Sequence, residues 1–497
     1  MYEYSWQHLL NSRRRRGGEG QNIDENYLVE RTEIERDYDR IVFSAPIRRL
    51  ANKTQVFPMD ENDSVRTRLT HSSEVSNLAR GAGVSLCCGN IFEEEKEDRI
   101  KFFRDVPTVL ATIGLVHDLG NPPFGHQGEA AIKDWFKNHF SESYRVEGEN
   151  EGEVNKPNLP YIFKDFLKFD GNAQTFRLVT RLHAADGDYG MDLTYATLAA
   201  MIKYPSFNSE SKSVYDKAGV FFSEKNIAVD VWGETGLEEG VRHPLTYIME
   251  VCDDIAYATI DVEDTIKKGY ASYNDLKNWL EEKGLVKDGG LFSDTFESIR
   301  EKIKKFKDSS FTDLTSDTVR EVSVEIFRSI VVNKFLSSAS AKFVHDYINN
   351  NILEAGSYYE LSKVFEYKEE LKELKNFTRS YGFNNKEVLR LELLGRNYIY
   401  SLMSFLWAGV KNLDKSLSGE NHYEKYIISL ISKNYLREFK RAFDQHDKEG
   451  CSEEEQKEYA RYQLITDFVS GMTESYLKRI YEEIKPLYEQ NFSSKIQ

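Results

Sequence analysis

A histidine and an aspartate stand side by side at the end of an apolar run, and another histidine follows a short turn. His117 and Asp118 come directly after residues 109–116, and the Gly/Pro-rich residues 120–125 lead to His126. Imidazole nitrogen and carboxylate oxygen together suit a divalent ion such as Mn, Fe, Co or Zn. Because a lone His–Asp pair is usually an ordinary helix end, a metal site requires further ligands elsewhere in the chain.

Two candidate ligands occur in distant segments. His71 ends the segment RTRLTH (66–71), and Asp253 lies in EVCDDIAY (250–257). Together with His117 and Asp118, they would hold one ion from separate helices. Such a site leaves coordination positions for water and substrate, as catalysis requires.

The segment around Asp253 has the pattern of a helix with one functional face. Asp253, Tyr257 and Asp261 are four residues apart, so they line up along a helix. The apolar residues between them indicate a buried helix, although a solvated acidic face is the simpler explanation. The same register favours Asp253 over its neighbour Asp254 as the ligand.

Helices are the elements that must position these residues. The chain has only 10 prolines in 497 residues, and residues 369–375 and 389–406 space their apolar side chains by threes and fours. Strand-like alternation is scarce, and residues 220–231 are the best candidate for a strand or hairpin. We therefore expect an all-α fold.

The clustered His, Asp and Gly residues suggest three parts. Residues 1–25 are expected to form a basic N-terminal arm, residues 26–290 the catalytic core, and residues 291–497 a helical C-terminal region. The run Arg13–Arg16, followed by two glycines, predicts a mobile segment that is either a solvated tail or a polyanion contact. Residues 147–160 and 206–213 are polar and are expected to be surface loops.

The composition limits the classes of protein. Lys+Arg 66 against Asp+Glu 82 gives a net charge of −16, which argues against a general nucleic-acid coat protein. No apolar run approaches the roughly 20 residues of a membrane helix, and no signal peptide is evident. The four cysteines have neither disulfide nor zinc-site spacing. A cytoplasmic protein without membrane contact is expected.

The candidate ligands resemble the H…HD…D signature of the HD superfamily of metal-dependent phosphohydrolases. Further motifs resemble the bacterial dGTP triphosphohydrolases of the longer type, and they occur in order over most of the chain. These motifs are RRL (48–50), KTQVFP (53–58), RTRLTH (66–71), HDLGNPPFGHQGEAAI (117–132), GNAQ (171–174), HPLTYIMEVCDDIAY (243–257) and SGMT (470–473). The resemblance implies an HD-domain helical fold whose C-terminal region completes the nucleotide pocket and the subunit contacts.

The resemblance implies a reaction in which dGTP and water give deoxyguanosine and inorganic triphosphate. Water would attack the α-phosphorus, aided by one divalent ion per active site, Mn, Mg or similar. His126 and Glu129 are three residues apart where a helix begins, and they match the family's catalytic pair for proton transfer. Alternatively, His126 only packs the turn and Glu129 only favours the helix N-terminus.

The resemblance also implies contacts to the triphosphate. Arg68 lies one turn before His71, within reach of a phosphate. Lys203 and Tyr204 match the family's phosphate-binding pair. Any one of these residues is, taken alone, more often an ordinary surface residue.

Sugar and base contacts are implied at four positions. Gln55 and Asp261 would hold the 3′-hydroxyl, and Tyr257 would pack under the deoxyribose and exclude a 2′-hydroxyl, unless it is only a core residue. Glu392 would read the guanine, unless it is only an exposed charge. The guanine-side arginines do not align, and the candidates are Arg437, Lys440 and Arg441.

Partners follow from the same resemblance. The family forms homo-oligomers, possibly hexamers here, and single-stranded DNA bound at residues 13–16 is a possible effector. The alternative activity is a broad-specificity deoxynucleoside triphosphate triphosphohydrolase regulated by nucleotide or single-stranded DNA. HD proteins acting on cyclic nucleotides or monophosphates are a more distant alternative.

Overall fold

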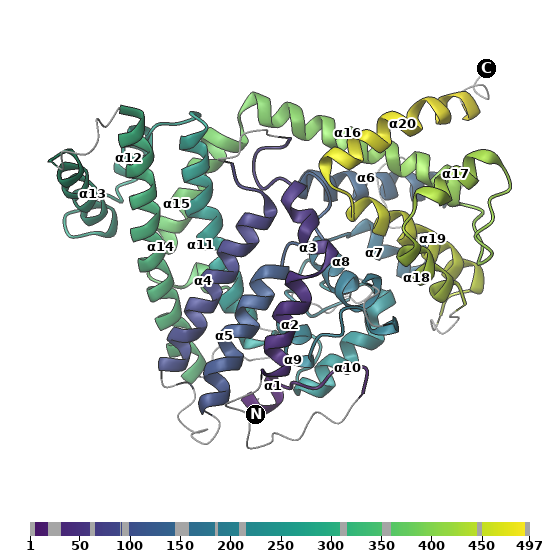
Figure 1. Cartoon of the computed structure of the whole chain (residues 1–497), viewed down its shortest axis with the longest axis horizontal. Helices are drawn as coiled ribbons and strands as arrows, with labels where there is room; N and C mark the ends of the chain where they lie inside the picture. The colour runs from purple at the N-terminus through teal and green to yellow at the C-terminus, as the bar shows by residue number, and fades with distance from the viewer. Residues whose placement is uncertain are drawn as a thin grey trace. The chain divides into compact units, whose positions relative to one another are not determined.

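The computed structural model describes residues 5–17, 31–59, 65–89, 91, 99–144, 159–183, 187–207, 215–308, 316–349, 359–444 and 450–492. Within these ranges all regular elements are helices, and the β pairing consists of two isolated bridges, Arg14–Thr194 and Phe207–Val220. The predicted all-α fold is confirmed (Figure 1). No helix in the described ranges combines the length and apolar character needed to cross a membrane.

Two compact units divide the chain, and each combines separate stretches of sequence. The first unit comprises residues 1–54, 116–243 and 392–497, and the second comprises residues 55–115 and 244–391. None of the four boundaries between these stretches coincides with the division near residue 290 that was expected from the motifs. That division remains a prediction about function.

The first unit contains most of the shorter helices. They are α1 (Trp6–Leu9), α2 (Glu33–Val42), α3 (Ala45–Arg49), η1 (Leu50–Asn52), α6 (Gly125–Ser143), η4 (Tyr161–Phe163), α7 (Lys164–Leu167), α8 (Gly171–Arg177), η5 (Leu178–Leu182), η6 (Gly187–Tyr189), α9 (Tyr195–Met201), η7 (Phe222–Glu224), α10 (Lys225–Thr235), α17 (His422–Leu430), α18 (Lys433–Asp444), α19 (Glu453–Ser470) and α20 (Glu474–Phe492).

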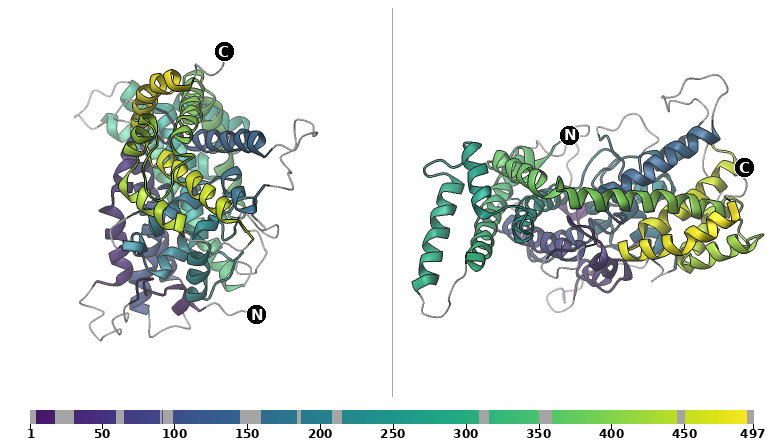
Figure 2. Two further views of the ribbon diagram at one scale, coloured as in Figure 1. Left: turned by 90° about the vertical axis from the view of Figure 1, so that its right-hand side faces the viewer. Right: turned by 90° about the horizontal axis from the view of Figure 1, so that it is seen from above.

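The second unit contains longer helices. They are α4 (Arg68–Cys88), α5 (Arg99–Val116), α11 (Pro244–Lys267), α12 (Tyr273–Glu282), α13 (Leu291–Asp308), α14 (Ser316–Ile348), η8 (Leu361–Lys363), α15 (Lys368–Thr378) and η9 (Arg379–Phe383). The helix α16 (Lys386–Val410) starts in the second unit and continues without a break into the first, as the long green helix of Figure 2.

Helix α11 is the centre of the second unit. It packs against α4, α14 and α15, and nearly all of its side chains are buried. Helices α4 and α5 approach each other closely because small residues lie between them. A Cβ at Gly83 would lie 2.8 Å from the Pro107 Cα, and one at Gly114 would lie 2.9 Å from the Ser76 Cα.

An aromatic cluster forms much of the core of the first unit. Trp135 stacks on His139 with ring centroids 4.8 Å apart, and Tyr462 stacks on Trp407 at 4.6 Å. Burial lowers the pKa of His139 to about 4, so this imidazole is neutral at physiological pH. The cluster joins α6, the helix that carries His126, to α16 and α19.

The predicted strand at residues 220–231 is wrong. These residues form η7 and most of α10, and only Val220 takes part in a bridge. Ile227, Ala228 and Val231 are all buried, and their spacing is that of one helix face rather than an alternating strand. Most of the two polar loops expected at 147–160 and 206–213 lies outside the described residues.

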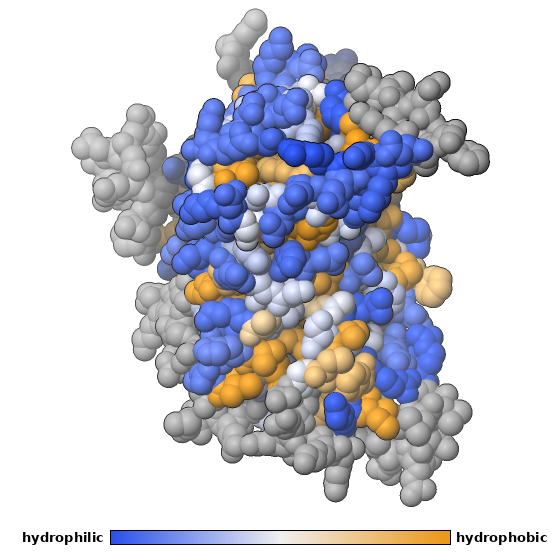
Figure 3. Space-filling view, turned by 90° about the vertical axis from the view of Figure 1, so that its left-hand side faces the viewer, coloured by the Kyte–Doolittle hydropathy of each residue, from blue (hydrophilic) through white to orange (hydrophobic). Residues whose placement is uncertain are grey.

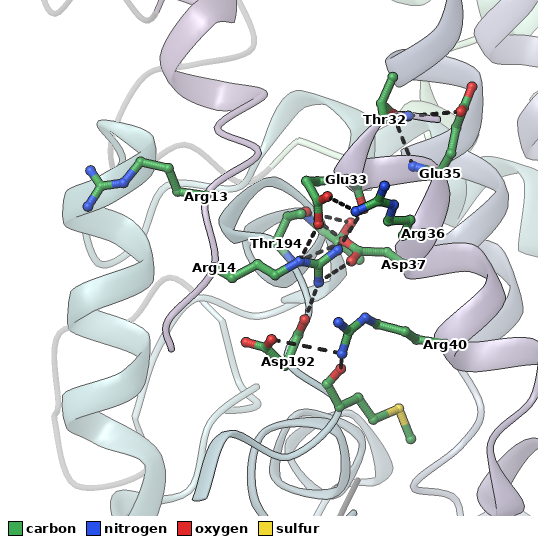
Figure 4. A network of polar contacts seen from close by, with 12 residues as sticks. Arg13, Arg14, Thr32, Glu33, Glu35, Arg36, Asp37, Arg40, Asp192 and Thr194 are labelled. Carbon is green, nitrogen blue, oxygen red and sulfur yellow. Dashed lines mark hydrogen bonds and ion pairs between the residues drawn. The ribbon is translucent and has the colours of Figure 1, made fainter. Parts of the chain in front are cut away.

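The basic residues near the N-terminus are packed against the first unit, whereas the sequence predicted a mobile arm. Arg14 forms ion pairs with Glu33 and with the fully buried Asp37, both at 2.8 Å, and also donates to the Asp192 carbonyl (Figure 4). Arg13 points the other way and pairs with Glu234 at 3.0 Å. The prediction of a mobile segment failed because the acidic residues that pair with Arg13 and Arg14 are distant from them in sequence.

The surface seen in Figure 3 is mostly hydrophilic, with separate hydrophobic areas between the charged side chains. Large exposed apolar residues of the second unit include Phe306 at 49% and Ile348 at 56% exposure. They belong to different helices. The expected homo-oligomer stays a prediction.

Candidate active site

The second unit brings His71 and Asp253 together. Thr67 caps α4, so His71 lies in its first turn, and its side chain is 1% exposed. Helix α11 packs on α4 through Val75, Ala256 and Ile260. This packing places the His71 Nε2 3.0 Å from the Asp253 Oδ1.

The two neighbouring aspartates of α11 face different partners. Asp253 faces His71, whereas Asp254 forms an ion pair with Lys375 of α15 at 2.5 Å. One turn further on, the ring of Tyr257 stacks on Phe383 with centroids 5.9 Å apart. Of the neighbouring residues Asp253 and Asp254, Asp253 is therefore the one that contacts His71.

Asp261 is fully buried in the second unit. Neither of its carboxylate oxygens has a hydrogen-bond partner among the described residues. Burial raises the pKa of Asp261 well above its ordinary value, and the nearby Asp264 raises it further. Arg66 opposes this effect and forms ion pairs with Asp264 and with Glu263. Burial and the neighbouring carboxylate thus both favour the protonated form of Asp261.

Two other expected substrate residues also lie in the second unit. Arg68 is the first residue of α4 and is 7% exposed. Gln55 is half-buried, and its Oε1 has no hydrogen-bond partner among the described residues.

In the first unit, the turn after α5 carries His117 and Asp118, with the His117 Nε2 3.6 Å from the Asp118 Oδ1. Asn121 donates a hydrogen bond to Asp118. The turn lies directly against α8: a Cβ at Gly120 would be 2.3 Å from the Gly171 carbonyl oxygen. Only glycine permits this approach.

His126 and Glu129 form a pair at the start of α6. The His126 Nδ1 lies 3.3 Å from the Glu129 Oε2, and the imidazole is 92% exposed while the carboxylate is 7% exposed. The other carboxylate oxygen accepts from the Gly171 N–H at 2.8 Å. A buried, anchored carboxylate therefore holds an accessible imidazole.

Residues in or next to two further motifs, KTQVFP (53–58) and SGMT (470–473), form hydrogen bonds that stabilise the turn between His117 and His126. The Lys53 Nζ is buried and donates to the Asn121 and Ser470 carbonyls. Glu474 accepts from the backbone N–H of Thr54 at 2.9 Å and from its hydroxyl. The KT and SGMT segments thus support the turn within the first unit.

Lys203 and Tyr204 follow α9 and lie among other cations. The Lys203 Nζ is 5.7 Å from the centroid of the Tyr204 ring, and the Lys217 Nζ is 5.9 Å from it. Lys217 pairs with Asp170 at 2.7 Å. The buried guanidinium of Arg242 lies 5.5 Å from the same ring centroid. This group can hold an anion and orient the Tyr204 ring.

Glu392 is half-buried on α16 in the first unit. Burial raises its pKa, and the charge of His126 opposes this rise. A Cβ at Gly395 would lie 2.4 Å from the Phe124 ring, so α16 lies directly on the turn before His126. Glu392 and His126 therefore belong to the same part of the first unit.

The three cations considered for guanine recognition lie on α18. Arg437 is exposed and donates to the Gly187 carbonyl at 3.1 Å, and Lys440 is exposed. Arg441 instead forms an ion pair with Glu438 at 3.3 Å.

Lys217 and Arg242 were missed in the sequence. Neither belongs to a quoted functional motif, and Lys217 stands in a polar loop of ordinary composition. Only the three-dimensional packing around Tyr204 identifies them.

Comparisons with known proteins agree with the helical fold. The family model described as HD domain matches residues 68–165, a range that includes His71, His117, Asp118, His126 and Glu129. The helical fold and these residues define a phosphohydrolase of the HD superfamily.

Relatives match over nearly the whole chain. A deoxyguanosinetriphosphate triphosphohydrolase-like protein of Listeria innocua is 33% identical over 97% of this chain and 99% of its own. One of Synechocystis is 29% identical with the same coverage. The deoxyguanosinetriphosphate triphosphohydrolase of Yersinia pestis is 30% identical over 94% of this chain and 95% of its own. The chain belongs to the deoxyguanosinetriphosphate triphosphohydrolase family.

Proposed function

We propose that the chain hydrolyses dGTP to deoxyguanosine and inorganic triphosphate, with water attacking the α-phosphorus. The His126–Glu129 pair is the observation that carries this proposal, because an exposed imidazole on a buried carboxylate suits proton transfer. The substrate is taken from the activity for which the Yersinia pestis relative is named.

We further propose that one divalent ion, Mn, Mg or similar, is bound by His71, His117, Asp118 and Asp253. Two imidazoles and two carboxylates form a donor set that such ions accept. When bound, the ion neutralises phosphate charge and lowers the pKa of water.

His126 would transfer a proton at the attacking water or at the leaving 5′-oxygen. Its Nδ1 faces Glu129, and the imidazole is largely exposed, so a substrate can reach the ring. The carboxylate orients the ring and stabilises its protonated form. Anchoring by Gly171 keeps Glu129 in place during the reaction.

Lys203, Tyr204 and Arg68 would bind the triphosphate, and we add Lys217 to this set. Its ammonium lies beside the Tyr204 ring and is 45% exposed on the side chain. Charge-assisted hydrogen bonds from such groups stabilise phosphate oxygens. Arg242 is proposed to keep the Tyr204 ring in position.

Gln55, Asp261 and Tyr257 would contact the deoxyribose. The buried carboxyl group of Asp261 would form a hydrogen bond with the 3′-hydroxyl. Tyr257, stacked on Phe383, would present a fixed ring that leaves no room for a 2′-hydroxyl. Glu392 would accept hydrogen bonds from guanine.

A broad deoxynucleoside triphosphate specificity is the second candidate function, because the guanine-side cations are unassigned. Regulation by nucleotide or single-stranded DNA, the homo-oligomer and the cytoplasmic location remain predictions. The ion pairs of Arg13 and Arg14 leave fewer free charges for DNA at this segment.

Product analysis with Mn²⁺ or Mg²⁺ and each of dGTP, dATP, dCTP, dTTP and GTP tests the proposal. Deoxyguanosine and intact triphosphate, formed from dGTP far faster than from the others, are expected. Triphosphate from all four deoxynucleotides would favour the second candidate and remove Glu392 from base recognition. Monophosphate and pyrophosphate, or no turnover, would contradict the reaction itself.

A further inference from the structure

A polar cavity lies in the first unit between η5, η7, α10, α18 and α19. Its volume is about 130 Å³, far above the 10–15 Å³ that one water molecule needs. Charged residues dominate part of its wall, namely Arg177, Arg181, Lys225, Glu438, Arg441 and Asp467.

One of these arginines is fully compensated by protein groups. Arg177 is 3% exposed, and it pairs with Asp467 at 2.7 Å and with Glu224 at 2.7 Å. Its Nε also donates to the Asp467 carboxylate. This network is structural, since every charge in it has a close partner.

In the described part of the chain, the ion pairs of Arg181 and Arg441 share one carboxylate, that of Glu438. The Glu438 Oε1 lies 3.3 Å from Arg441 and 3.9 Å from Arg181, and the second distance is too long for a hydrogen bond. The Nε of each arginine is buried and has no hydrogen-bond acceptor in the described part of the chain. A guanidinium group has five N–H donors, and leaving such donors without acceptors is costly.

The local charge balance is positive. Burial raises the pKa of Glu438 to about 7, so the shared carboxylate is only partly ionised at neutral pH. Arg15 lies near Arg181: burial lowers its pKa, and the like charge of Arg181 lowers it further. Lys225 adds another cation to the wall.

We propose that this cavity binds a phosphate-type oxyanion between Arg181 and Arg441. Two adjacent guanidinium groups match the geometry of phosphate oxygens, and such an anion would supply the acceptors that the protein lacks. The site is separate from the His126–Glu129 pair, and the proposal does not depend on the proposed hydrolysis.

Calorimetric titration of the full-length protein with orthophosphate, and separately with tripolyphosphate, tests the site. Arg181→Met and Arg441→Met should each weaken one class of binding site about tenfold or more, the scale of a charged hydrogen bond. Lys433→Met, which removes an exposed charge from the same helix, should leave the affinity within about twofold. Lys203→Met serves to identify phosphate that binds at the proposed active site, because this variant should weaken that binding and leave the cavity between Arg181 and Arg441 unchanged.

Unchanged phosphate affinity in both arginine variants would overturn the proposal. If only orthophosphate binds, the cavity accepts a single phosphate group. If tripolyphosphate also binds, the cavity accepts a phosphate chain. Wild-type crystals soaked in tungstate provide a test without substitution. An anomalous peak within hydrogen-bond distance of Arg181 and Arg441 is expected, and tungstate bound only elsewhere would refute the site.

Discussion

Glu129 has two roles that substitution can separate. One oxygen of its buried carboxylate accepts from the Gly171 N–H at 2.8 Å, and the other faces the His126 imidazole at 3.3 Å. Glu129→Ala removes both contacts. Glu129→Gln keeps an acceptor for Gly171 but removes the negative charge beside His126.

The two variants should therefore differ in stability and agree in activity. Alanine leaves a buried N–H without an acceptor, which costs about 1–3 kcal/mol of unfolding free energy, whereas glutamine should cost far less. Both should reduce turnover of dGTP by about 10²-fold or more, the usual scale for acid–base catalysis. Both should retain bound metal, because Glu129 is not a proposed ligand.

Urea unfolding, metal analysis and steady-state turnover measure these quantities. Glu142→Gln on the exposed side of the same helix is the matched control and should resemble the unsubstituted protein. Near-normal turnover of Glu129→Gln would show that the carboxylate charge has no catalytic role. Equal stability of the alanine and glutamine variants would show that the Gly171 contact contributes nothing.

Three further predictions concern other parts of the chain. Asp118→Ala should lose bound metal and activity while keeping the helical circular dichroism, and retained turnover would contradict the ligand assignment. Arg14→Met should lower the unfolding free energy by about 3–5 kcal/mol in urea, because it leaves the buried Asp37 without its cation, whereas the exposed Arg13→Met should change little. Glu438 has a folded pKa of about 7 against 4.5 for an ordinary glutamate, so its contribution to stability is full below pH 4.5 and is lost as the pH rises through 7. Glu438→Gln should consequently gain about 3 kcal/mol relative to the unsubstituted protein between pH 4.5 and pH 8, and parallel pH profiles of the two proteins would refute this.

Local periodicity was sufficient to predict much of the fold. Residues 369–375 lie in α15, and residues 389–406 lie in α16, because an apolar stripe every three to four residues is a property of the segment itself. The two compact units could not be predicted in this way. They arise from packing between segments hundreds of residues apart, which leaves no periodic signal.

In the candidate active site, too, features set by local spacing could be predicted from the sequence, whereas contacts between residues distant in sequence could not. The i, i+4 spacing along α11 correctly indicated that Asp253 and Tyr257 occupy a common helix, and Asp253 lies beside His71. By contrast, nothing near Lys217 in the sequence indicates its place beside Tyr204. The pairing of Arg14 with Asp37 was equally hidden, because a run of arginines looks the same whether it is solvated or paired.

The ammonium group of Lys53 has a consequence for protein synthesis. It donates hydrogen bonds to the carbonyls of Asn121 and Ser470, so the proposed catalytic turn is held by a residue that lies about 350 positions later in the sequence. A nascent polypeptide on the ribosome carries every proposed catalytic residue long before Ser470 and Glu474 emerge. Translation must therefore have passed Glu474 before these residues can be held in their working arrangement.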